Sequence, residues 1–466
     1  MKKNNLFRVI GAVILGYVLL SWILPLGIDL FGGKDVPETQ AGIISIFMVL
    51  SEAVSGFGNV LVYILAVGGF YGILDATGVY KKAINLLVKK FKGKEKLVLI
   101  TTIVVIVLLS SICGLELGLF AIFPLVISVI SLMGYDSLVA LSATVGATII
   151  GIYGSTLAGT TYGINNQVTG LGTYNAILAK IILFVLGLGL LIFFVLRYIK
   201  KNKIKPNMPK EVDKVINENN KKVWPLYLVV AIVSVLFILG TSAWENIFGY
   251  NWFATAHEKI MSLTIGDFAI FSKLFGGLDA LGTWFTPYRF QYYTVLLMLA
   301  SLILAIVYKV KFNDATEAYF KGIKDFIVPG LLAVACCSVF IFVYYYPILN
   351  TVTSWILSLS KDFNVALSGL YTLISGTFYV DYYYFTSYCL PTLISATTDT
   401  TLYSIISVLF TNMYGLIMLI APTSVLLMVS LTITEVSYKS WIKYIWKLFV
   451  SLLVVSFIVL MIMLLI

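Results

Sequence analysis

Two short polar interruptions within long apolar stretches have residue types that could bind a small solute or an ion. Glycine and hydroxyl residues form the first, which comprises Gly154, Ser155, Thr156, Thr160 and Thr161. The second consists of Pro422, Thr423 and Ser424. A membrane helix that unwinds here offers helix ends, of which N-termini favour anionic groups and C-termini favour cations. Hydroxyl groups could also hold Na⁺, at Ser155, Thr156, Thr423 and Ser424. Alternatively, the small residues only allow close helix packing, and the proline only kinks its helix.

Two isolated acids in apolar sequence, Glu116 and Asp381, form a second set of candidates. Ionisable residues inside a membrane are costly and are usually functional. Either acid could carry a proton or bind a cationic group, unless both lie near water at the ends of hairpins. Gly114 lies beside the first acid. Tyr383 follows the second, where its hydroxyl could contact a solute or its ring could join an interfacial aromatic belt.

The elements that must position these residues are membrane-spanning helices. The chain has 466 residues, of which 60% are hydrophobic and only 12% charged, whereas an average soluble domain is about 25% charged. Apolar runs of roughly 20 residues recur throughout, each long enough to cross about 30 Å of hydrocarbon. We therefore predict an all-α polytopic membrane protein with about 10–12 spans.

Composition also excludes several function classes. The net charge of +10 comes largely from lysines in loops between spans, which favours membrane topology over a nucleic-acid partner. Four cysteines lack disulfide or metal spacing, and His257 is the only histidine. We expect no metal site, no cofactor and no enzymatic activity.

Lysine-rich loops predict the orientation of the chain. Basic clusters occupy 81–96, 197–222, 309–324 and 439–447, and short basic loops remain cytoplasmic. This places the N-terminus inside and the C-terminus outside, with the chain in a plasma (inner) membrane. The number of membrane crossings agrees with this orientation only if 97–134 and 364–397 each enter and leave on the same side. Each could do so either as a re-entrant hairpin or as two full crossings.

The two halves then follow the same order of elements with opposite orientation. Residues 1–198 contain a span, the hairpin 97–134, a broken helix at 136–165 and a further span. A basic cytoplasmic linker, 199–223, leads to 224–466, which contains the hairpin 364–397 and the broken helix 399–434. Asp136 and Asp399 are good N-caps at the start of the broken helices. An inverted repeat with broken helices in matching positions is typical of secondary transporters.

Several motifs spread over nearly the whole chain resemble one known family. These are Gly68-Gly69-Phe70-Tyr71-Gly72, Leu87 to Lys96, Gly134-Tyr135-Asp136-Ser137-Leu138, Gly154-Ser155-Thr156 and Pro422-Thr423-Ser424. They resemble the YfcC-like family of basic amino-acid or four-carbon-dicarboxylate carriers, within the ion transporter superfamily. The resemblance implies a homodimer, elevator-like movement and coupling to Na⁺ or H⁺.

The sequence departs from this family at both hairpins and after both breaks. Only Glu116 remains of the adjacent acids at the first tip, and Val380-Asp381-Tyr382 replaces a Ser-Gly run at the second. No lysine lies clearly in mid-membrane, so a solute with an ammonium group fits the acids better than a dicarboxylate. We predict a secondary active transporter of an amino acid or organic anion, driven by ion coupling or exchange. The alternative is a channel whose pore is lined by the broken helices.

Overall fold

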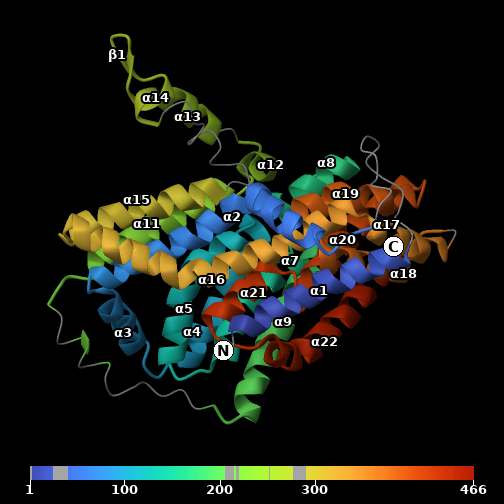
Figure 1. Cartoon of the computed structure of the whole chain (residues 1–466), viewed down its shortest axis with the longest axis horizontal. Coiled ribbons are helices and arrows are strands. Elements are labelled where there is room, and N and C mark those ends of the chain that lie inside the picture. Colours follow the sequence, from blue (N-terminus) through green and yellow to red (C-terminus); the bar gives the residue numbers. More distant parts are fainter. Residues whose placement is uncertain are drawn as a thin grey trace.

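The protein is a bundle of helices (Figure 1), and its computed structural model describes residues 3–24, 40–204, 212, 215–216, 220–250, 252–275, 290–360 and 362–465. The first described elements are α1 (Lys3–Ile23), α2 (Ser45–Ala76), α3 (Tyr80–Lys90), α4 (Glu95–Cys113), η1 (Leu117–Ile122), α5 (Phe123–Leu132), α6 (Ser137–Leu141), η2 (Ser142–Gly146), α7 (Ala147–Tyr153), η3 (Gly159–Gly163), α8 (Ile164–Thr169) and α9 (Ile177–Lys201). The second group is α11 (Trp224–Thr241), α12 (Trp244–Phe248), α13 (Trp252–Met261), β1 (Thr264–Ile265), β2 (Phe268–Ala269), α14 (Ile270–Phe275), α15 (Phe290–Val307), α16 (Phe312–Tyr345), α17 (Ile348–Ser358), α18 (Val365–Phe378), α19 (Tyr382–Ser395), η4 (Thr400–Leu402), α20 (Tyr403–Met418), α21 (Val425–Ile433) and α22 (Tyr438–Leu465).

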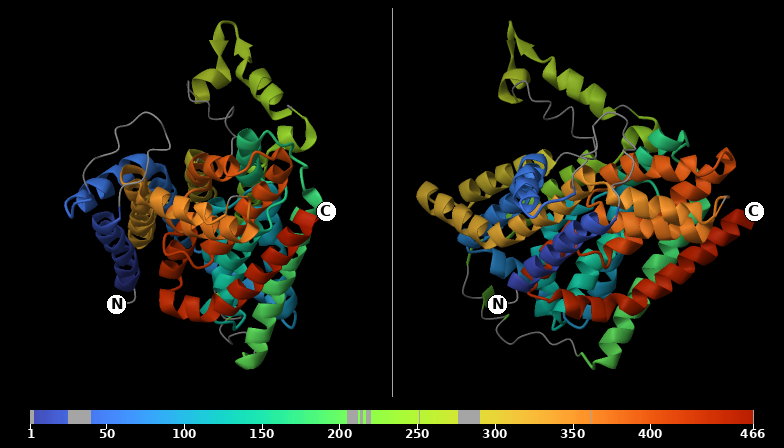
Figure 2. Two further views of the ribbon diagram at one scale, coloured as in Figure 1. Left: turned by 90° about the vertical axis from the view of Figure 1, so that its right-hand side faces the viewer. Right: turned by 45° about the vertical axis from the view of Figure 1, so that its right-hand side comes forward.

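The prediction of an all-α multi-pass membrane protein is confirmed. Eight helices within the described residues are long and apolar enough to cross a membrane. The antiparallel β1–β2 pair is confined to an excursion between α13 and α14 that projects from the helical body (Figure 2). About half of the expected basic linker, 199–223, lies outside the described residues.

The longest helices, α2 and α16, pack against each other along much of their length, as both views in Figure 2 show. Glycine makes this approach possible. A Cβ added to Gly68 would lie 2.5 Å from the backbone oxygen of Gly322, and one added to Gly72 would lie 2.1 Å from that of Ala318. The glycine-rich motif at 68–72 therefore serves backbone-to-backbone packing of the kind small residues give membrane helices.

Both predicted hairpins are present. The first joins α4 to η1 and α5 through Gly114–Glu116, and the second joins α18 to α19 through Tyr379–Asp381. Each arm of the second has 14 residues, about 21 Å at 1.5 Å per residue, which is short of the roughly 30 Å hydrocarbon core. Each arm is therefore shorter than a full crossing requires, and a re-entrant hairpin at 364–397 remains a prediction.

Both predicted helix breaks are also present. The first broken helix unwinds between the end of α7 at Tyr153 and the start of η3 at Gly159. The second unwinds between Met418 and Val425. The broken helices cross at Gly415, where an added Cβ would lie 2.3 Å from the backbone nitrogen of Tyr153. The two interruptions therefore belong to elements that touch backbone to backbone.

Helix boundaries differ from the predictions where charge or glycine interrupts the apolar pattern. Helix α16 begins at Phe312, so the basic cluster 309–324 is mostly helical and continuous with the apolar run that follows it. Helix α2 begins at Ser45 and contains a kink at Phe57, whose φ and ψ are −116° and 20°. The basic segment 81–96 is largely helical, as α3.

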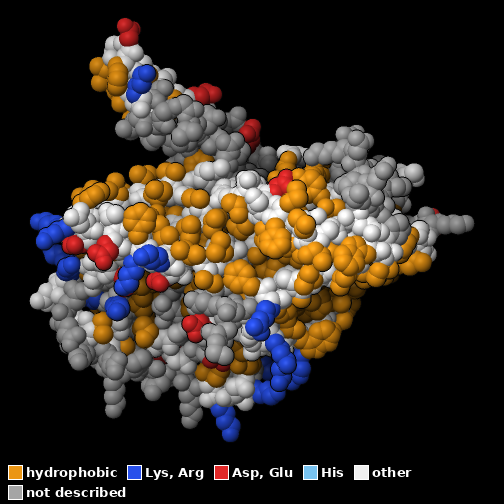
Figure 3. Space-filling model, in the orientation of Figure 1, with side chains coloured by type: hydrophobic (Ala, Val, Ile, Leu, Met, Phe, Trp, Pro, Cys, Tyr) orange, Lys and Arg blue, Asp and Glu red, His pale blue; other side chains and the backbone are white. Residues whose placement is uncertain are grey.

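Charged side chains are unevenly distributed on the surface (Figure 3). Lys and Arg gather at the left and lower parts of this face, near the α15–α16 turn and the start of α22, whereas the right-hand end near the C-terminus is mostly hydrophobic or uncharged. This separation agrees with the predicted distribution of lysine-rich loops. The orientation of the termini remains a prediction.

Candidate functional site

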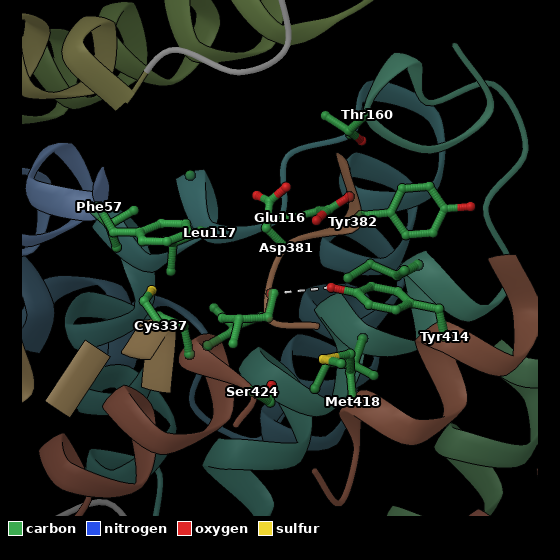
Figure 4. A pocket seen from close by; sticks show the side chains of 18 of the residues that line it. Phe57, Glu116, Leu117, Thr160, Cys337, Asp381, Tyr382, Tyr414, Met418 and Ser424 are labelled. Carbon is green, nitrogen blue, oxygen red and sulfur yellow. Dashed lines mark hydrogen bonds between the residues drawn. The ribbon is translucent and has the colours of Figure 1, made fainter. Parts of the chain in front are cut away.

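A cavity of about 110 Å³ lies where the two hairpin tips and the two broken helices meet. The predicted site residues that line it are Gly114, Glu116, Thr160, Asp381 and Ser424. Glu116 and Asp381 come from opposite hairpins, 265 positions apart in sequence, yet their side chains lie near each other in Figure 4. The fold therefore brings both predicted acids and parts of both breaks to one place.

The first tip depends on the conformation of Gly114. This residue has φ +74°, which is left-handed, and a Cβ here would lie 2.5 Å from the hydroxyl oxygen of Thr160. Glycine is the residue that adopts such a conformation without cost. Glu116 follows and directs its carboxyl group toward the cavity beside Thr160 (Figure 4). Its Oε1 is buried without a hydrogen bond among the described residues, although the carboxyl group interacts with the Thr160 side chain.

The second tip uses its acid differently. Asp381 is the N-cap of α19, and its Oδ1 accepts hydrogen bonds from the backbone N–H groups of Tyr383 at 2.8 Å and Tyr384 at 3.3 Å. These bonds satisfy donors that a helix start leaves open. Tyr382 lines the cavity and is buried, whereas the Tyr383 side chain is 44% exposed and is absent from the lining. The tyrosine ring at the cavity is thus that of Tyr382, and not that of the predicted Tyr383.

Hydroxyl groups at the first break bond mainly within the protein. Ser155 Oγ and Thr161 Oγ1 are 2.6 Å apart. Thr156 Oγ1 lies 3.2 Å from Ser111 Oγ, and Ser111 donates to the carbonyl of Gly154 at 2.6 Å. Gly154 itself packs against α9, where a Cβ would lie 2.5 Å from Phe184 Cα. These residues stabilise the unwound backbone behind the cavity.

The second break shares this pattern and also reaches the cavity. Thr423 donates from its hydroxyl to the carbonyl of Thr377 on α18. The Pro422 carbonyl lies 3.9 Å from the thiol sulfur of Cys336 on α16. Ser424 caps α21 by accepting from Leu427 N at 3.4 Å, and it lines the cavity. Sodium ligation by the hydroxyl groups of the two breaks remains a prediction.

A buried asparagine links the first broken helix to the second tip. Asn165 Nδ2 donates to Thr411 Oγ1 at 2.9 Å, and Asn165 Oδ1 accepts from the Tyr382 hydroxyl at 2.9 Å. Nearby, Asn412 Nδ2 donates to the carbonyl of Tyr153, at the edge of the first break, over 3.0 Å. The sequence contains two polar pairs, at 165–166 and 411–412. It does not reveal that Asn165 and Thr411 are in contact.

Lys180 is also buried. This lysine is the fourth residue of α9 and is 2% exposed. Its Nζ lies 3.4 Å from the ring centroid of Tyr162 and 3.4 Å from the carbonyl of Thr173. A cation over an aromatic face is attracted by the ring quadrupole. Lys180 therefore holds η3, the element that carries Thr160, against α9.

Aromatic rings and two carboxyl groups dominate the polar character of the cavity. Four rings line it, from Phe57, Tyr293, Tyr382 and Tyr414. The Tyr414 hydroxyl donates to the carbonyl of Val380 at 3.3 Å, so it braces the second tip (Figure 4). The described lining contains no Lys, Arg or His. Arg289, one of three arginines in the sequence, lies outside the described residues.

Comparison with known proteins gives the family. Residues 4–380 and 396–465 match the DcuC family, described as C4-dicarboxylate anaerobic carrier. The chain belongs to this family. The match covers the first hairpin tip and both breaks, but it omits residues 381–395, which include Asp381 of the second tip. It indicates a carrier rather than an enzyme. The finer YfcC-like resemblance remains a prediction.

Two individual proteins are similar over different shares of the chain. An uncharacterized protein of Haemophilus influenzae is 28% identical over 180 residues, which are 39% of this chain and 35% of that protein. The match thus spans about a third of that relative's length. The crystal structure of the Alcanivorax borkumensis YdaH transporter aligns over 98% of this chain and 97% of its own, with a TM-score of 0.39 and 12% identity.

Proposed function

We propose that this chain is a secondary active transporter that carries a small solute with an ammonium group across the plasma membrane. One observation supports this most directly. The cavity at the meeting point of the two tips receives carboxyl groups from Glu116 and Asp381, and no cationic side chain is part of its described lining. A solute ammonium group would compensate both acids, and aromatic faces attract such cations.

The family description makes an organic anion the second candidate. A dicarboxylate would bring two negative charges into a buried site that already holds two carboxyl groups. Uncompensated buried charge is strongly unfavourable. Such a solute would need protonated acids, a co-bound Na⁺, or a cationic group from outside the described residues, such as Arg289. An amino acid carries one ammonium and one carboxylate group, so it would bring less uncompensated negative charge into the cavity than a dicarboxylate.

We further propose alternating access as the transport cycle, with Na⁺ or H⁺ coupling or exchange. The residues 1–198 and 224–466 would act as inverted repeats, each supplying one hairpin and one broken helix to the site. A substrate bound between the tips would move with them in an elevator-like step. A homodimer would provide the fixed scaffold, in which the tight α2–α16 packing is a natural rigid element.

Counterflow in proteoliposomes tests the proposal. Vesicles are loaded with unlabelled 4-aminobutyrate, putrescine or succinate, which have similar chain lengths and carry one, two or no ammonium groups. We expect trans-stimulated uptake of the same labelled compound for an ammonium-bearing solute and none for succinate. Saturable counterflow identifies a carrier, whereas large single-channel currents without counterflow would mean that the broken helices line a pore.

Arg289→Gln separates the two substrate classes further. If succinate is transported and this variant abolishes its transport, the anion candidate is correct and the ammonium proposal is wrong. If transport of the ammonium-bearing solute is retained in Arg289→Gln, that arginine plays no part in binding it.

A further inference from the structure

A second, chemically opposite site lies between α9 and α22. A groove of about 730 Å³ runs between the C-terminal part of α9 and the N-terminal part of α22. Each helix contributes two cationic side chains spaced four residues apart, namely Arg197 with Lys201 and Lys443 with Lys447. Residues at this spacing share one face of a helix. Among the described residues, the lining contains these four positive groups and no Asp or Glu.

The floor of the groove consists of aromatic side chains that pack against one another. The Tyr444 ring packs against Phe194 with centroids 4.9 Å apart and against Tyr198 at 4.6 Å. The Tyr198 hydroxyl donates to Asp136 Oδ2 at 2.9 Å, behind the lining. Asp136 Oδ1 caps α6, where the first broken helix begins. The groove is therefore a built feature, and its floor is bonded to the start of the first broken helix.

An apolar surface continues from the cationic end along both helices. Leu190 and Phe193 line the groove, and Phe193 is 60% exposed. On the same helical faces, the exposed side chains of Leu186, Val454 and Ile458 extend this surface toward the middle of the membrane spans. A ligand that fits must carry negative charge at one end and long apolar groups at the other.

Helix dipoles do not explain all four cationic groups. Arg197 and Lys201 lie near the C-terminus of α9, where cations are favoured. Lys443 and Lys447 lie near the N-terminus of α22, where they are not. A general excess of cytoplasmic lysine predicts positive charge in this region, but not its alignment on two facing stripes. Lys200 and Lys439, on the same helices, lie outside the groove lining.

We propose that this groove binds the phosphate headgroup of an anionic phospholipid, with its acyl chains along α9 and α22. Basic pockets between membrane helices suit such headgroups. The four cationic groups match the phosphate, and the continuous apolar faces match the chains. This site is independent of the solute proposed for the central cavity.

Native mass spectrometry of the full chain in micelles can test the site by counting bound lipids at each lipid concentration. The probes are cardiolipin and dioleoyl phosphatidylglycerol, with dioleoyl phosphatidylcholine as the zwitterionic comparison. Lys443→Gln/Lys447→Gln removes two groove cations. Lys200→Gln/Lys439→Gln removes the same charge from outside the lining. Lys443→Arg/Lys447→Arg keeps the charge and checks that the groove tolerates substitution.

We expect one tight anionic lipid per chain, with binding weakened about 25-fold in the groove double variant, given about fivefold per lysine. The control double variant and the arginine variant should change affinity by less than about threefold. Equal weakening in both glutamine variants would mean diffuse surface attraction and would overturn the proposal. So would equal binding of phosphatidylcholine, or displacement of the lipid by an equal concentration of glycerol 3-phosphate, which would indicate a site for soluble phosphate.

Discussion

The two hairpin tips each bring one carboxyl group to the same cavity, but only one of these groups has a structural task. Asp381 caps α19 through its Oδ1, so its presence is explained in part by helix formation. Glu116 caps no helix, and its Oε1 accepts no hydrogen bond from the described residues. An unsatisfied buried acceptor costs stability. This difference makes Glu116 the stronger candidate for the proposed contact with a solute.

The largest expected effect follows from removing that charge. Glu116→Gln keeps the shape of the side chain and should lower solute uptake by roughly 100-fold, because a hydrogen bond to a charged group contributes up to about 3 kcal/mol. The midpoint of thermal unfolding should stay the same or rise. Uptake into proteoliposomes and a melting curve check both. Glu317→Gln, at an exposed position of α16, is the matched control, and equal loss there would make the effect nonspecific.

The second tip depends on a network that the first tip lacks. Asn165→Leu removes one hydrogen-bond partner from each of the buried Tyr382 and Thr411 hydroxyl groups. These hydroxyls then keep only each other and the Ser407 carbonyl as partners. We expect a loss of roughly 2–3 kcal/mol of stability, measured as a lower unfolding midpoint in detergent. Gln167→Leu, exposed on the same helix α8, should be nearly neutral. Unchanged stability in Asn165→Leu would show that the network does not hold the tip.

The first tip depends instead on backbone conformation. Gly114→Ala should cost roughly 1–2 kcal/mol because an L-residue is strained in the left-handed region, and its Cβ would press on Thr160. Gly93 has φ +81° with no atom within 4 Å of an added Cβ. Gly93→Ala should therefore show the conformational cost alone and retain full transport. Equal transport in both variants would show that transport does not depend on the contact with Thr160.

A smaller effect on uptake than at Glu116 is expected at Asp381. Asparagine caps a helix as well as aspartate, whereas alanine loses about 1 kcal/mol. Asp381→Asn should melt like the wild type, and Asp381→Ala should melt lower. If the charge also binds solute, both variants should reduce uptake about tenfold. Asp399→Asn, which changes an exposed cap at Thr401, should leave uptake intact; normal uptake in Asp381→Asn would assign that carboxyl group to capping alone.

The sequence predicted correctly those features that depend on the residue types within one short segment. Glycine, proline and hydroxyl residues within apolar runs predicted both breaks, and Asp136 and Asp399 predicted two helix starts. Tertiary contacts determined the rest. The neighbours Tyr382 and Tyr383 have the same side chain, and only the geometry after the Asp381 cap directs the first inward. Asn165 and Lys180 look like polar residues at helix ends, and their burial depends on packing against distant elements.

Thermal stabilisation by a matched solute series tests the central claim most directly. Purified wild type and Glu116→Gln are titrated with putrescine, 4-aminobutyrate and succinate, since a ligand that binds the folded state stabilises it by RT ln(1 + [L]/Kd). The account predicts concentration-dependent stabilisation of the wild type by an ammonium-bearing solute, little effect of succinate, and loss of the stabilisation in Glu116→Gln. Stabilisation by succinate alone, undiminished in Glu116→Gln, would contradict it.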